Sequence, residues 1–186
     1  MTRLVLINGA PGSGKSTLAR RYVADHPLSL ALELDAVRSM LGGWLEAAHD
    51  AGLITRRMAL AMARVQLAGG RDVVVPQFLG RLEFVLALEE LCGQVGVDFV
   101  EVALLSSPQD AADRFVQRSR DPESEAHRDA GALLDRIGGL GELGPMYDRL
   151  LEVVANRPRT LVVTTVGGRP DRAYRDLLAL LARTHE

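Results

Sequence analysis

Five apolar runs along the chain predict β-strands, and helical patterns separate them. Residues 73–75 and 161–163 are continuous aliphatic runs, which suit strands that are covered on both faces. Strands that alternate with helices predict an α/β fold with a parallel sheet and helices packed on both sides. The predicted strands cover residues 3–8, 28–34, 72–76, 98–105 and 159–165.

The segments between these strands have helical spacing. The first helix is expected from Gly14 to about Asp25, since the residue before Pro27 avoids the α region. Residues 110–136 are dense in charge and predict an excursion outside the core. The other expected helices cover residues 35–47, 50–68 and 82–95. One further helix is expected to begin near Pro145, and a last one contains Tyr174.

A glycine-rich loop joins the first strand to the first helix. Gly9 and the run Gly14, Lys15, Ser16 have phosphate-loop spacing. An ordinary glycine-rich turn would show this spacing, a lone lysine and a flanking strand and helix only by coincidence. The glycines let successive N–H groups point at phosphate oxygens, and the helix adds its positive end. Lys15 would bridge the β- and γ-phosphates, and the Ser16 hydroxyl would hold Mg²⁺. The expected nucleotide-binding residues in this loop are Gly9, Gly12, Ser13, Gly14, Lys15, Ser16 and Thr17.

Composition strengthens the assignment of Lys15. The chain has 22 basic residues, and the sequence contains 21 arginines and a single lysine, at position 15. A compact ammonium fits beside phosphates where a planar guanidinium does not, so the one lysine is expected at the phosphates.

Charge and cysteine content limit the other possibilities. The net charge of −2 does not indicate a long nucleic-acid track. The one cysteine, Cys92, lies on the apolar face of a predicted helix and is expected to be a buried structural thiol. The N-terminal apolar stretch is too short for a signal peptide, and no run approaches the ~18 apolar residues of a membrane helix. These features predict a cytoplasmic enzyme with no membrane partner.

Asp35 and Arg38 follow the second predicted strand and supply candidate chemistry for a hydroxyl acceptor. Asp35 could accept a hydroxyl proton, and Arg38, one turn later, could bind a substrate anion. Equally, Asp35 could cap the helix and pair with Arg38 on its surface. Spacing alone leaves these two interpretations open.

Further candidates lie in the charged excursion and after the third strand. Arg114 and Arg118 share a helix face and could close over the nucleotide, or they could pair with nearby acids as solvated residues. Gln77 could contact substrate, and Phe78 is expected to belong to a turn. A loop that recognises the base is expected near residues 166–170.

Together with the run Gly144 to Tyr147, these motifs resemble the phosphate-loop kinases typified by polynucleotide 5′-kinase. The zeta-toxin and chloramphenicol phosphotransferase families look like more distant relatives. The resemblance implies a three-layer P-loop NTPase fold with sheet order 2-3-1-4-5. It also implies a single kinase domain over residues 1–186 with a small helical lid inserted at roughly 108–140.

The resemblance also implies roles for particular residues. Asp35 would be the general base, Arg38 would hold the acceptor, and Arg118 would contact the donor phosphates with support from Arg114. The kinase family has an acid at the end of the third strand, where this chain has Pro76 and Gln77.

The sequence therefore predicts an enzyme that transfers the γ-phosphate of ATP or GTP, with Mg²⁺, to a hydroxyl. The acceptor would be a nucleic-acid 5′-end or a small molecule. The alternative is a nucleotide-binding regulatory module with little or no turnover, which the missing acid favours. A mechanochemical ATPase is less favoured because such proteins are usually larger.

Overall fold

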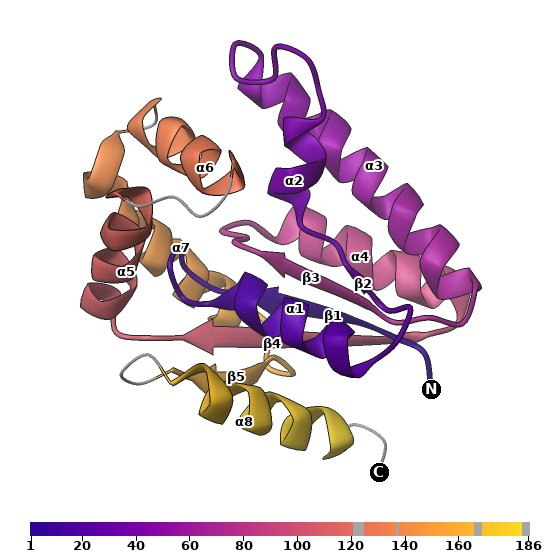
Figure 1. Cartoon of the computed structure of the whole chain (residues 1–186). Helices are drawn as coiled ribbons and strands as arrows, with labels where there is room; N and C mark the ends of the chain where they lie inside the picture. Colours follow the sequence, from indigo (N-terminus) through magenta and orange to yellow (C-terminus); the bar gives the residue numbers. More distant parts are fainter. Residues whose placement is uncertain (121–124, 137, 166–168, 184–186) are drawn as a thin grey trace.

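The computed structural model describes residues 1–120, 125–136, 138–165 and 169–183. Its five strands form one parallel sheet in the order β2-β3-β1-β4-β5, which confirms the predicted fold and strand order. Figure 1 shows helices on both sides of this sheet. The strands are β1 (Arg3–Asn8), β2 (Leu30–Ala31), β3 (Val73–Gln77), β4 (Asp98–Leu105) and β5 (Leu161–Thr164).

The helices occupy most of the chain between the strands. They are α1 (Lys15–Asp25), α2 (Leu34–Ser39), α3 (Ala48–Ala68), α4 (Leu82–Val95), α5 (Pro108–Arg120), α6 (Glu125–Arg136), the short 3₁₀ helix η1 (Gly139–Glu142), α7 (Leu143–Ala155) and α8 (Pro170–Arg183). Among the described residues, no helix is long and apolar enough to cross a membrane.

The central strand β1 is apolar from Leu4 to Ile7 because each of its faces is buried in a different core. Leu4 and Leu6 pack with α3 and α4 on one face. Val5 and Ile7 pack with α1 and α8 on the other face. Alternate side chains of a strand point to opposite faces, so a continuous apolar run is what a doubly covered strand requires.

The second strand is much shorter than residues 28–34. Leu28 has a positive φ of 66°, and the Ser29 N–H donates to the His26 carbonyl oxygen, so a turn precedes the strand. Leu34 already begins α2, which ends at Ser39 rather than near residue 47. The early end of this strand carries Asp35 out of the sheet and onto a helix.

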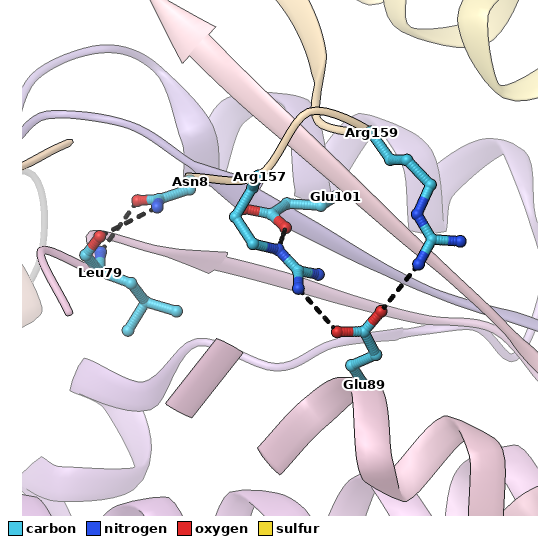
Figure 2. Close-up of polar contacts among 6 residues, drawn as sticks. All are labelled: Asn8, Leu79, Glu89, Glu101, Arg157 and Arg159. Atoms are coloured by element: carbon cyan, nitrogen blue, oxygen red, sulfur yellow. Dashed lines mark hydrogen bonds and ion pairs between the residues drawn. The ribbon is translucent and has the colours of Figure 1, made fainter. Parts of the chain in front are cut away.

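A polar network ties the far half of the sheet to its helices (Figure 2). The Arg157 guanidinium lies 2.8 Å from Glu89 of α4 and 2.8 Å from Glu101 of β4. The hydrogen bond that Arg157 donates to Glu89, together with its contacts with Glu101, raises the pKa of Arg157 against the opposing effect of burial. The Glu101 side chain is only 4% exposed, so Arg157 neutralises a buried carboxylate.

Replacing Arg157 by Met should lower the free energy of unfolding by about 3–5 kcal/mol, because Glu101 would stay buried without its partner. Urea denaturation measures this loss. Adding Glu101→Leu should restore much of it, since an apolar pair replaces the ion pair. The control is Arg159→Met, because the Arg159 side chain is 94% exposed although it also lies 3.7 Å from Glu89. Equal losses for Arg157→Met and Arg159→Met would contradict this account.

Cys92 should not react with a thiol reagent at pH 8 while the protein is folded. Burial raises the pKa of its thiol to about 12, so little of the reactive thiolate is present. The thiol should react at the normal rate once the protein is unfolded in urea. Reaction with 5,5′-dithiobis(2-nitrobenzoate) in both conditions tests this, and rapid labelling of the folded protein would contradict the predicted structural role.

Candidate functional site

The three glycines of the phosphate loop are required for different reasons. Gly12 and Gly14 have φ values of 80° and 98°, which residues with a Cβ rarely adopt. Gly9 does not need such a φ, but a Cβ there would lie 2.7 Å from the Leu104 carbonyl oxygen of β4. At Gly12 a Cβ would also lie 2.3 Å from the Ala111 carbonyl oxygen of α5. The loop is therefore packed closely against both β4 and α5.

Lys15 begins α1 at the end of this loop. Its ammonium donates a hydrogen bond to the Ala10 carbonyl oxygen at 2.9 Å, so the side chain folds back over the loop. The Ser13 N–H donates to the same carbonyl oxygen at 3.1 Å. With the positive end of α1 beneath it, the loop forms a compact cationic site that suits phosphate oxygens.

Two cavities flank the phosphate loop. One, of about 180 Å³, is lined by Lys15, Ser16 and Asp35. The other, of about 210 Å³, lies toward β5 and α8 and is lined by Thr17 and Arg169. Ser16 and Thr17, although adjacent in sequence, thus line different cavities. We call the first the Asp35 cleft and the second the Arg169 cavity.

Asp35 and Arg38 both line the Asp35 cleft, as their position after β2 predicts. Arg38 donates to the Asp35 carboxylate at 2.9 Å, so the pairing that spacing left open is present. Asp35 does not cap the helix, because the N-cap residue of α2 is Glu33 and that helix has no side-chain cap hydrogen bond. The Arg38 side chain is 13% exposed and that of Asp35 is 38% exposed, so Arg38 is the more buried member of the pair.

Trp44 holds Arg38 from the other side. The guanidinium carbon lies 4.7 Å from the centre of the Trp44 ring, a cation–π contact. Sequence reasoning assigned no role to this residue. The neighbouring glycines at 42–43 were the available signal, since they bend the chain after α2 and return Trp44 to Arg38.

Asn8 is a positioning residue that sequence reasoning also missed. Its buried side chain donates to the Leu79 carbonyl oxygen at 3.0 Å and accepts from the Leu79 N–H at 2.9 Å (Figure 2). This reciprocal pair fixes the segment after β3 beside the phosphate loop. Phe78 and Gln77, which line the Asp35 cleft, are placed by it.

The end of β3 carries no carboxylate, as the sequence indicates. Gln77 pairs in register with Asn8 and presents an amide to the Asp35 cleft. Mg²⁺ fits the Ser16 hydroxyl, since it prefers oxygen ligands. The described residues contain no group of three or more His, Cys, Asp or Glu side chains that could hold a metal. A magnesium ion here would therefore keep most of its water or phosphate ligands, as Mg²⁺ usually does.

Helix α5 is joined directly to the phosphate loop. The Arg114 Nε donates to the Gly12 carbonyl oxygen at 2.9 Å, and Arg114 also lines the Arg169 cavity. Its buried Nη2 has no hydrogen-bond partner among the described residues, so it can serve an added anion. Arg118 lies one turn later on α5, and the role predicted for its side chain falls outside the described side chains.

The expected base-recognition loop is only partly described. Residues 166–168 lie outside the described residues, whereas Arg169 and Pro170 line the Arg169 cavity. Met146, from the predicted helix after the excursion, lines the Asp35 cleft. Its neighbour Tyr147 donates to the Ser106 carbonyl oxygen at 2.8 Å, which ties α7 to the end of β4.

Comparison with known proteins identifies the family. The AAA domain family matches residues 4–137, which is more than half of the chain. No curated protein matches the chain. A candidate kinase of Chloroflexus aurantiacus J-10-fl has a similar structure, with a TM-score of 0.72 and 18% identity over 100% of this chain and 98% of that one.

A gluconokinase of Sinorhizobium meliloti 1021 is also similar, with a TM-score of 0.62 and 21% identity over 97% of this chain and 91% of that one. At these identities the two structures establish a common P-loop fold. The family match extends from β1 through α6 and includes the phosphate loop, Asp35, Arg38 and Arg114. The chain belongs to the AAA domain family.

Proposed function

We propose that this chain is a kinase that transfers the γ-phosphate of ATP or GTP to a hydroxyl of an acceptor bound in the Asp35 cleft. The observation that carries the proposal is that Lys15 and Ser16 line one cleft together with Asp35 and Arg38. A phosphate-binding lysine and a carboxylate that can take a proton thus share a single space. The structural similarity to a gluconokinase of Sinorhizobium meliloti supports this class of reaction.

The donor nucleotide would lie across the phosphate loop. Its base would enter the Arg169 cavity, and its phosphates would extend over residues 9–17 to the Asp35 cleft. Arg114 and Arg118 would add positive charge from α5. Mg²⁺, bound at Ser16 and the phosphates, would neutralise charge on the transferred group.

The acceptor hydroxyl would lie between Asp35 and the γ-phosphate. Its oxygen forms the new bond to phosphorus as the bond from phosphorus to the bridging β,γ-oxygen breaks, and ADP or GDP leaves. Asp35 takes the hydroxyl proton, and Arg38 orients both the carboxylate and the acceptor. Lys15 stabilises the charge that develops on the phosphoryl oxygens.

Residues 108–140 would act as a lid within a single domain of residues 1–186. Helix α5 touches the phosphate loop, and α6 contributes Leu133 and Leu134 to the Asp35 cleft. A cover of this kind keeps water from competing with the acceptor hydroxyl. The single buried thiol suits a cytoplasmic enzyme.

Replacing Lys15 by Ala should lower phosphoryl transfer at least about 100-fold, because a donor to the transferred group is lost. Lys15→Arg should lose nearly as much, since a planar guanidinium does not fit where a compact ammonium does. Transfer of labelled γ-phosphate is the measurement. Arg71→Lys, at an exposed position, is the control and should match the unchanged protein. Full activity of Lys15→Ala would contradict the proposal.

Asp35→Asn should lower kcat about 10²- to 10⁴-fold while nucleotide affinity is unchanged, because the general base is lost and the donor site is not. Steady-state kinetics and nucleotide titration separate the two effects. Asp50→Asn, on the exposed start of α3, is the matched control.

A second candidate function is a nucleotide-binding regulatory module, which the amide of Gln77 at the usual position of an acid favours. Tight nucleotide binding without turnover, together with a partner captured only when nucleotide is bound, would establish that alternative. Asp35→Asn would then change neither property.

A further inference from the structure

We infer that the acceptor is a small hydroxyl compound with a substantial apolar part, and not a nucleic-acid 5′-end. This inference rests on the proposed function and identifies the substrate class for the same site. It follows from the lining, the charge balance and the small volume of the Asp35 cleft.

The lining of the cleft is apolar on several sides. Phe78 comes from the segment after β3, Phe115 from α5 and Met146 from α7, while Leu133 and Leu134 come from α6. Phe115 and Leu134 are only 3% and 4% exposed. Four separate elements thus surround the polar group of Lys15, Ser16 and Asp35 with hydrocarbon, which stabilises an apolar ligand.

The charge balance of the cleft does not suit a polyanion. Among the described residues that line it, the cations are Lys15 and Arg38. Lys15 serves the donor phosphates in the proposed reaction. Arg38 is neutralised by Asp35 at 2.9 Å, its other face is covered by Trp44, and its buried Nε–H is left without a hydrogen-bond partner among the described residues. A nucleic-acid strand is held by several uncompensated cations along its backbone, and this cleft offers no such row.

The cleft is also small. Its volume of about 180 Å³ is below the roughly 300 Å³ at which pockets for drug-sized ligands begin. The Arg136 guanidinium of α6 donates to the Leu45 carbonyl oxygen in the segment after α2. This contact joins α6, which lines the cleft through Leu133 and Leu134, to the segment after α2.

The test compares acceptors under one set of conditions. The protein is given ATP labelled in the γ-phosphate, Mg²⁺ and either a 5′-hydroxyl oligonucleotide or a library of hydroxyl compounds below about 300 Da. The library is divided into compounds retained and not retained on a reversed-phase column. Lys15→Ala defines the background.

Label on retained compounds, in at least tenfold excess over the oligonucleotide and the unretained compounds, is the expected result. Preferential label on the oligonucleotide or on unretained compounds would overturn the inference and leave the proposed kinase activity standing. Absence of label from every acceptor would overturn the proposed function, and the inference with it.

A variant at the lining gives an independent readout on the best retained acceptor. Leu133→Asn should raise the acceptor KM about tenfold and leave the nucleotide KM unchanged, since an amide replaces apolar contact. Met146→Asn should act in the same direction if Leu133→Asn does not fold. The control is Leu86→Asn, because Leu86 of α4 is 49% exposed and does not line the cleft. An unchanged acceptor KM in both folded lining variants would contradict the inference.

Discussion

The close packing of the phosphate loop against β4 and α5 is the constraint on which the site depends. The loop can turn back over the start of α1 only because Gly12 and Gly14 adopt positive φ values. It can lie against the sheet only because Gly9 lacks a Cβ. The same packing brings α5, with Arg114, to the loop, so the anion site and the helix that covers it are fixed together.

The parallel sheet then determines which residues meet the loop. The carboxyl ends of β1, β2 and β3 lie at one edge, and the chain leaves that edge with Asn8, Asp35 and Gln77. Ligand sites of open parallel sheets form at this edge. Asn8 has a structural task there, since it binds the Leu79 backbone and leaves Asp35 as the carboxylate of the cleft.

Much of this arrangement is predictable from the sequence because it depends on local patterns. Apolar runs indicated the strands, and the spacing from Gly9 to Ser16 indicated the loop. The short second strand was not predictable, since a turn at Leu28 and the early start of α2 depend on packing. The contact of Arg136 with Leu45 joins residues far apart in the sequence, and the spacing of Arg38 and Trp44 indicates no contact by itself. Only the folded chain shows these two contacts.

The Asp35–Arg38 pair illustrates how a structural and a catalytic interpretation can hold at once. The ion pair that spacing suggested is present, and both of its residues line the cleft that Lys15 also lines. A paired arginine orients a carboxylate, and an oriented carboxylate is what a proton acceptor requires.

A crystal structure with Mg²⁺ and a non-hydrolysable ATP analogue would test the central claim most directly. The expected result is that the base occupies the Arg169 cavity and that the γ-phosphate enters the Asp35 cleft beside Lys15. A γ-phosphate directed away from Asp35, or a triphosphate bound elsewhere than the loop of residues 9–17, would contradict the claim.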